Sequence, residues 1–242
     1  MPMMRAMMLH YNDDPNVHNL PCVSVQYMFG RDMLVAPIFY EGSDREVYLP
    51  AGGWVHLWTG QRTEGPWNGR VRAPLLQTPV WLRSGAVIPL LPEGAQTIGR
   101  YDDPSRWLEA LGTERWEFML APGEGACNQG GVDITQSDGG QGGDGAYTVR
   151  VSFSRERGVV PGNIALKIRL PEEDEASCTV AAVSGWPEAG TAGLSWEWNH
   201  SAWESGLWIE LRLPETSAGA GAANALADAD IVLHIHKNGH GR

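Results

Sequence analysis

Residues 45–60 decide the fold of this chain, and their sequence is REVYLPAGGWVHLWTG. Polar and apolar residues alternate over Arg45–Leu49, and Trp54 alternates with His56 and Trp58 over the run Trp54–Trp58. An apolar residue at every second position is the pattern of a strand that buries one face. Ala51-Gly52-Gly53 and Thr59-Gly60 are turn-forming sequences that end the two runs. This stretch therefore predicts two short strands joined by a turn.

The same pattern extends in both directions from this stretch. Turn residues separate further strand-like runs at Gln26–Phe29, Met33–Phe39, Arg70–Ala73, Pro79–Leu82 and Ala86–Leu91. Short strands with a turn every few residues are typical of an antiparallel β-sandwich. We expect one sandwich over residues 25–96, with Ala86–Leu91 as its closing strand, preceded by a connector over residues 1–24.

A second β region follows the loop-like residues 93–106. Its strands are predicted at Trp116–Leu120, Ala146–Phe153, Asn163–Leu170, Cys178–Val183, Leu207–Leu213 and Asp230–Ile235. Tyr147, Val149 and Val151 alternate with polar residues and should share one face. Ser137–Gly145 and Ser217–Ala229 are predicted to be loops. The chain is thus predicted to be all-β, with two antiparallel sandwiches, the second over residues 97–242.

The overall charge and the cysteines limit the partners and the cellular compartment that we expect for the protein. The net charge of −11 repels nucleic acid and anionic membranes, and no apolar run approaches the roughly 18 residues that span a bilayer. We therefore expect neither nucleic acid nor membrane as a partner. Cys22, Cys127 and Cys178 form no CxxC pair and are odd in number, which favours a reducing compartment and a cytoplasmic protein. Residues 1–10 resemble the interior of a domain rather than a signal peptide, so we expect the natural N-terminus to be missing.

No metal or cofactor site is predicted from the sequence. His234 and His236 lie two apart on a predicted strand and would share a face, but no third ligand accompanies them. His10 and His56 stand alone in strand-like contexts and are interpreted as structural. There is no phosphate-binding loop and no nucleophile elbow.

Eleven tryptophans leave one candidate for sugar binding. Aromatic rings can stack on sugar rings, but sandwich cores also use tryptophan, and core packing is the better interpretation for most of them. Trp196, Trp198 and Trp203 lie close together in a segment predicted to be a polar loop. These three residues are therefore the candidate sugar-binding site.

Four motifs in order resemble the C-terminal part of glycoside hydrolase family 31. They are the Met-rich segment and Asp-Asp-Pro turn of residues 2–15, then QYMFG and LVAP within residues 26–37, then VYLPAGGW and WTG within residues 47–60, and PVWLRSGAVIP at residues 79–89. Within the family, residues 3–8 and 54–58 look most like the bacterial and fungal α-xylosidases. His10-Tyr11-Asn12 departs from the family, which has an acidic residue, Phe and Pro there.

The resemblance implies a (β/α)₈ enzyme that cleaves α-linked glycosides with retention, using one Asp as nucleophile and another as acid and base. Both lie upstream in the family, so no catalytic residue is assigned to this chain. The acidic pairs present, Asp13-Asp14 and Asp102-Asp103, precede prolines and are interpreted as turn residues, as is Asp144 in its glycine-rich tract. Substrate would bind through the missing barrel, without a cofactor, and the sandwiches would bury a barrel face and, in some members, make homo-oligomer contacts.

Three hypotheses follow. The chain is a truncated α-glycosidase that is inactive alone, with α-xylosides favoured as substrates and α-glucosides next. Alternatively, it is a free-standing carbohydrate-binding or structural sandwich module, or a subunit that completes a split enzyme.

Overall fold

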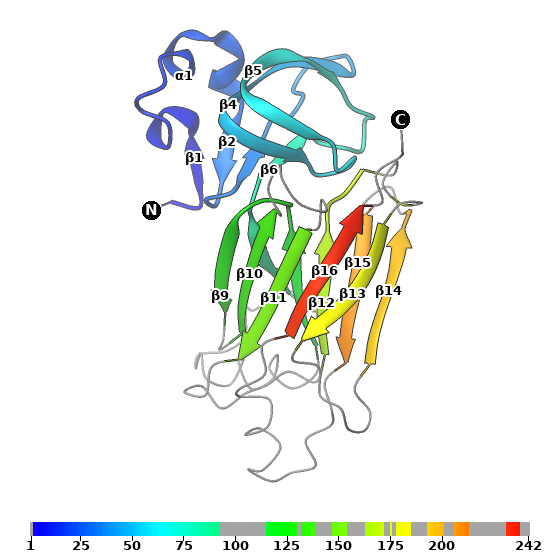
Figure 1. Cartoon of the computed structure of the whole chain (residues 1–242). Helices are drawn as coiled ribbons and strands as arrows, with labels where there is room; N and C mark the ends of the chain where they lie inside the picture. Colours follow the sequence, from blue (N-terminus) through cyan, green and yellow to red (C-terminus); the bar gives the residue numbers. More distant parts are fainter. Residues whose placement is uncertain are drawn as a thin grey trace, which may run out of the picture.

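The computed structural model confirms an all-β chain (Figure 1). It describes residues 2–91, 115–129, 132–138, 147–153, 163–171, 175, 178–184, 193–200, 206–212 and 231–237. Three sheets make up the two parts of the molecule: a proximal six-stranded sheet from residues 4–83, and two distal five-stranded sheets that face each other.

The proximal sheet has the strand order β1-β2-β3-β6-β4-β5. Its strands are β1 (Met4–Ala6), β2 (Tyr27–Phe29), β3 (Met33–Val35), β4 (Asp44–His56), β5 (Arg62–Arg72) and β6 (Val80–Arg83). All its neighbours pair antiparallel. The first strand comes from the predicted connector, which is therefore part of the sheet.

The rest of the connector covers one face of that sheet. It contains two 3₁₀ turns, η1 (Met7–Leu9) and η2 (Pro21–Val25), and one helical turn, α1 (Asn16–Asn19). The connector contributes Met7, Val17, Cys22 and Val23 to a core that it shares with the sheet, whose members include Met28, Leu34, Leu49, Trp54 and Trp81. Burial of these side chains holds the connector on the sheet.

The turn predicted at Ala51-Gly52-Gly53 is wrong. β4 continues through it as one strand of 13 residues, and only its register with β5 shifts, between Leu49 and Gly52. Gly52 has a φ of +111°, which an extra residue in a bulge can require and which glycine adopts readily. The bulge bends the strand instead of ending it.

The distal sheets have the orders β13-β16-β11-β10-β9 and β14-β15-β12-β8-β7. The strands are β7 (Val87–Leu90), β8 (Arg115–Leu120), β9 (Gly125–Gln129), β10 (Val132–Asp138), β11 (Tyr147–Phe153), β12 (Asn163–Ile168), β13 (Cys178–Ser184), β14 (Gly193–Asn199), β15 (Gly206–Arg212) and β16 (Ile231–Lys237). Tyr147, Val149 and Val151 do share one buried face, in the core between the two sheets.

The distal part differs from the sequence prediction in two respects. β8 and β12 pair in parallel, whereas an antiparallel sandwich was expected. Ala86–Leu91, the expected closing strand of the first sandwich, forms β7 and pairs with β8. The chain passes from β6 to β7 within three residues, so the two parts meet directly.

The junction between the two parts is closely packed. Gly85 has a φ of +87°, and its amide donates to Ala121 O at 3.0 Å. Gln136, buried in the distal core, donates from Nε2 to the carbonyl oxygens of Ala86 at 3.0 Å and Ala121 at 3.1 Å. An apolar cluster joins Val55 and other residues of the proximal sheet to residues of β8 and the following loop. These contacts fix the orientation of one part on the other.

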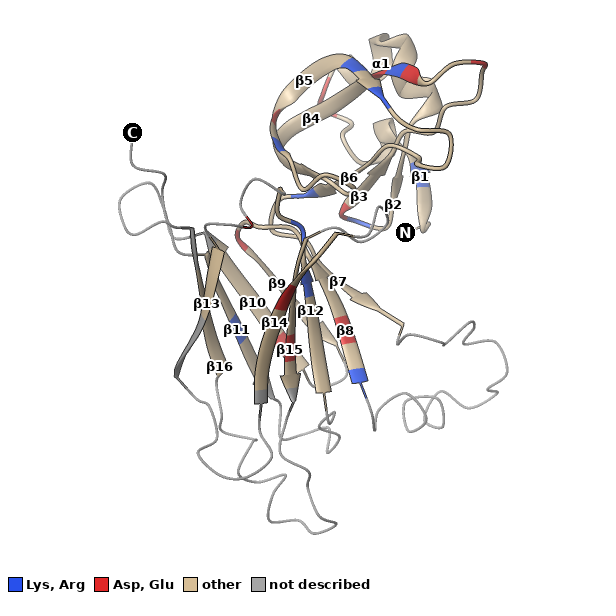
Figure 2. Cartoon of the chain, turned by 90° about the vertical axis from the view of Figure 1, so that its right-hand side faces the viewer, with Lys and Arg blue, Asp and Glu red and all other residues tan. Residues whose placement is uncertain are grey.

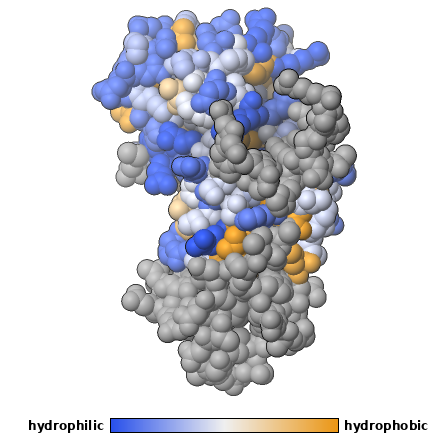
Figure 3. Space-filling model, viewed as in Figure 1, coloured by the Kyte–Doolittle hydropathy of each residue, from blue (hydrophilic) through white to orange (hydrophobic). Residues whose placement is uncertain are grey.

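In the part of the chain that the structure describes, no helix combines the length and apolar character needed to cross a bilayer. On the face drawn in Figure 3, hydrophilic residues cover most of the upper part, and hydrophobic residues show there only in small separate areas.

Candidate functional site

The acidic pair Asp13-Asp14 lies beside a groove of about 430 Å³ between the connector and β4. Tyr48 Oη donates to Asp14 Oδ2 at 2.5 Å, and the Asn16 amide donates to Asp14 Oδ1 at 2.9 Å. Burial and the bond to Asp14 raise the pKa of Tyr48 to about 12. Both oxygens of Asp14 are thus committed to holding the turn before α1, and Asp13 is exposed. The structure supports the turn interpretation of this pair; Asp102, Asp103 and Asp144 lie outside the described residues.

A second group of carboxylates lies on the outer face of the distal sheet that contains β8, β12, β14 and β15 (Figure 2). Glu117 is only 3% exposed and lies 3.0 Å from Lys167 Nζ and 3.2 Å from Arg115 Nε. Lys167 Nζ also stands 4.4 Å from the centre of the Trp208 ring, so it occupies one face of that ring. The Glu117 carboxylate is therefore paired with two cations and serves the packing of the sheet.

Two of the three candidate sugar-binding tryptophans are on β14, which corrects the predicted polar loop. Trp196 pairs with Ile209 and is 45% exposed. Trp198 is partly buried and packs against the distal core. Trp203 lies outside the described residues. Of the described pair, Trp196 alone offers a largely accessible ring.

His56 occupies a structural position. Its ring lies 5.0 Å from that of Trp81, and Nδ1 lies 2.9 Å from Thr59 Oγ1. Burial lowers the pKa of His56 to about 4, so the ring is neutral near pH 7. His234 lies on β16, beside Thr148 and Ala181. Across the ranges that the structure describes, no three metal-ligating side chains come together.

The three cysteines are unpaired. Cys22 and Cys178 are buried, and burial raises the pKa of the Cys22 thiol. A buried thiol with a raised pKa carries little thiolate near neutral pH and is a poor nucleophile.

Three arginines with specific partners, of which Arg5 and Arg45 are buried, were not anticipated from the sequence. Arg5 and Arg83 converge on His10, and Arg45 donates to backbone carbonyl oxygens of the connector and the β3–β4 loop. The one sequence feature that could have pointed to the cluster of Arg5, Arg83 and His10 was the unusual residue His10 itself. Arg45 alternates with apolar residues on its strand, and this pattern predicts that its side chain faces the solvent. The structure instead buries it.

Comparison with known proteins assigns the class. Residues 1–88 match the model of the glycosyl hydrolase family 31 C-terminal domain. The proximal part therefore matches a C-terminal β domain of glycoside hydrolase family 31. This match over residues 1–88 confirms the resemblance seen in the sequence.

Several relatives share this region. The chain is 45% identical over 85 residues to sulfoquinovosidase of Escherichia coli, which is 35% of this chain and 12% of that protein. It is 36% identical over 102 residues to α-xylosidase of Saccharolobus solfataricus, which is 41% of this chain and 14% of that protein. The matched region thus spans only a small share of each relative.

The likeness in fold extends over nearly the whole chain. A cycloalternan-forming enzyme from Listeria monocytogenes matches 99% of this chain and 21% of its own, with a TM-score of 0.61 at 23% identity. A family 31 dextranase from Flavobacterium johnsoniae matches 98% of this chain and 29% of its own, with a TM-score of 0.61 at 21% identity. The distal sandwich therefore has the fold found at the corresponding place in these structures.

Proposed function

We propose that this chain is the C-terminal portion of a retaining α-glycosidase and is inactive alone. The catalytic barrel would supply both carboxylates, and the two sandwiches would support it. Terminal α-xylosides are the favoured substrates of the whole enzyme and α-glucosides the next. The observation that carries the proposal is the match of residues 1–88 to a family domain that follows the catalytic barrel.

The distribution of exposed apolar side chains supports a covered proximal surface. Of the large apolar side chains that are exposed in the described ranges, all but Trp196 lie within residues 2–91: Met3, Met4, Met8, Leu9, Val25, Phe39, Tyr40, Leu75, Leu76 and Leu91. Water-exposed apolar surface of this kind is often covered by another protein surface.

The most exposed of these side chains lie on two neighbouring loops. Leu75 is 97% exposed and Leu76 is 74% exposed, and both lie on the loop of residues 73–79. Backbone hydrogen bonds of 3.0 and 2.8 Å tie this loop to residues 36–43, which carry Phe39 and Tyr40. We infer that the patch formed by Phe39, Tyr40, Leu75 and Leu76 contacts the barrel.

An activity assay tests the proposal directly. The pure chain should release no p-nitrophenol from p-nitrophenyl α-xyloside or α-glucoside above the rate in buffer, because no pair of carboxylates is assigned to it. The complete gene product, expressed in parallel, should hydrolyse one of the two. Turnover by the pure chain, abolished by heating, would contradict the proposal.

A second candidate function, sugar binding by the distal sandwich, is favoured by the exposure of Trp196. If the chain is a binding module, xyloglucan oligosaccharides should quench tryptophan fluorescence. Trp196→Ala should then weaken that binding severalfold, since an aromatic contact contributes about 0.5–1.5 kcal/mol beyond its buried area. Trp208→Ala, which removes a ring already covered by Lys167 on one face, is the matched control. Absence of saturable quenching would rule this candidate out.

A further inference from the structure

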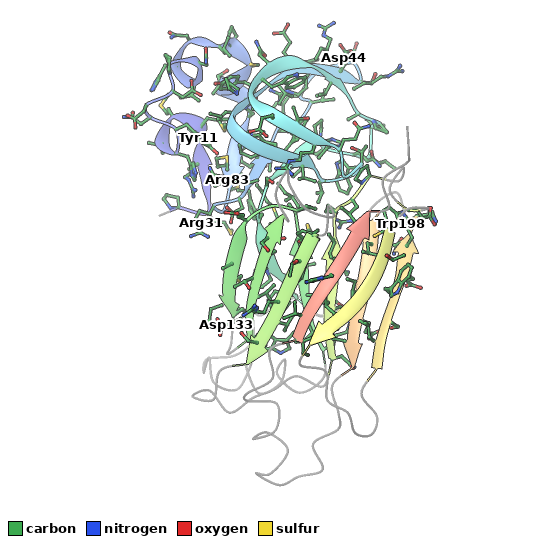
Figure 4. All side chains as sticks on the ribbon, in the orientation of Figure 1. Tyr11, Arg31, Asp44, Arg83, Asp133 and Trp198 are labelled. Carbon is green, nitrogen blue, oxygen red and sulfur yellow. The ribbon has the colours of Figure 1, made fainter. Side chains whose placement is uncertain are left out.

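One cluster of charged side chains lies where the connector meets the end of the proximal sheet. Arg5, on β1, is 7% exposed and directs Nε to His10 Nδ1 at 3.2 Å and Nη2 to the same nitrogen at 2.5 Å. Arg83, at the end of β6, places Nη2 at 3.2 Å from His10 Nε2 and donates to Tyr11 Oη at 2.5 Å. Figure 4 shows Tyr11 and Arg83 close together, with Arg31 below them. The imidazole ring of His10 therefore stands between two guanidinium groups.

This arrangement cannot satisfy both arginines. A guanidinium only donates hydrogen bonds, and a neutral imidazole has a single nitrogen that accepts one. Only one of the two arginine contacts can therefore be a hydrogen bond at any moment. A protonated imidazole has no acceptor at all, so proton uptake would remove the remaining bond and bring three cations together.

The remaining charges around His10 do not offset this effect. Arg31 and Asp32, in the turn between β2 and β3, are the other charged groups that act on the ring. Asp32 is the carboxylate that favours the proton, but Arg31 Nε lies 3.8 Å from its Oδ2. Burial, followed by Arg5 and Arg83, lowers the pKa of His10 from its ordinary value of 6.5. Once it is charged, the ring of His10 therefore repels both arginines.

We propose that His10 is an acid-sensitive latch: its neutral ring helps to hold connector residues 8–13 on β1 and β6, and its protonation loosens them. Other contacts hold the ends and the middle of this segment: Met7 is buried in the proximal core, Arg83 donates to Tyr11 Oη, and Tyr48 donates to Asp14. The later part of the connector is held separately, by Arg45 at the carbonyl oxygen of Cys22. Release would therefore be confined to the first part of the connector. This inference does not depend on the glycosidase activity proposed above.

The direction of the pH dependence follows from the lowered pKa. As pH falls, the unfolded chain binds a proton at His10 before the folded chain does. The contribution of His10 to stability is therefore complete above about pH 6.5 and is lost progressively below that pH.

Hydrogen exchange measured by mass spectrometry tests the latch. The amides of His10 and Tyr11 both donate to Met7 O at 2.9 Å, so peptides within residues 2–14 report release directly. After correction for the intrinsic effect of pH on exchange, protection of these peptides should fall at least severalfold between pH 7.5 and 5.5 in the wild type. His10→Gln, whose side chain does not titrate, should show no such fall, and peptides within residues 20–26 should stay protected in both proteins.

A second variant keeps the test decisive if glutamine loosens the connector at every pH. His10→Glu supplies a carboxylate to both arginines, so it should raise protection of residues 2–14 at pH 5.5 above that of the wild type. Its melting temperature at pH 5.5 should be higher by about 2–4 °C. An equal fall in protection in all three proteins, or an equal loss within residues 20–26, would overturn the proposal.

Discussion

Replacing Gly85 with alanine is expected to lower the free energy of unfolding by about 3 kcal/mol or more. A left-handed backbone costs a residue with a Cβ about 1–2 kcal/mol, and overpacking adds about 1–3 kcal/mol. Gly85 has a φ of +87°, and an added Cβ would lie 2.0 Å from Glu124 O. That oxygen belongs to backbone on the distal side of the junction, so relief would require the two parts to move apart. Urea unfolding of both proteins measures the difference.

Gly30→Ala is the matched control for this effect. Gly30 also has a positive φ, +62°, but nothing lies within 4 Å of a Cβ built there. Its substitution should therefore cost only the backbone term, about 1–2 kcal/mol. If Gly85→Ala were no more destabilising than Gly30→Ala, the junction would be looser than the structure indicates.

The second large effect is expected from Arg45→Met, which should destabilise the fold by about 3 kcal/mol. Arg45 is buried and donates hydrogen bonds to four backbone carbonyl oxygens: Pro37 at 2.6 Å, Glu46 at 3.0 Å, Cys22 at 3.1 Å and Val25 at 3.2 Å. Leaving buried polar groups without partners costs about 1–3 kcal/mol each. Burial lowers the pKa of Arg45 because the buried charge loses its hydration. Replacing the charged side chain by methionine therefore regains that desolvation cost. The four lost bonds should outweigh that recovery.

Thermal and urea unfolding of Arg45→Met should be compared with those of Arg70→Met. Arg70 lies on the neighbouring strand β5 and forms an exposed ion pair with Asp44 at 3.1 Å. Surface ion pairs contribute at most about 1 kcal/mol, so this control should be close to the wild type. Similar losses in the two variants would show that Arg45 does not fasten the connector as described.

Local alternation predicted many of the strands because it reports directly on a buried face. Tyr147, Val149 and Val151 are an example, and all three are buried. β14 has the same alternation, with Leu194, Trp196 and Trp198 opposite polar neighbours, but its acidic and amide residues favoured a loop. On β10, the inward-facing Gln136 interrupts the apolar series, although its side chain bonds to two carbonyl groups at the junction.

Features that depend on distant parts of the chain were not visible in the sequence. The parallel pairing of β8 with β12 joins segments about 48 residues apart, as in Arg115 with Asn163. No local pattern specifies such a partner, because the same alternating strand can pair in either direction. The convergence of Arg5 and Arg83 on His10 likewise depends on the sheet bringing β1 and β6 to one end of the core.

The short crossing from β6 to β7 has a practical consequence for dividing this polypeptide. A fragment of residues 1–96 would contain β7 without its partner β8. The remaining fragment would then expose an unpaired edge of β8, and exposed strand edges promote aggregation. A cut just before β7 would instead break the chain inside the backbone contacts of Gly85 and Ala86. The two parts should therefore be cloned, and exchanged with those of related proteins, only as a pair.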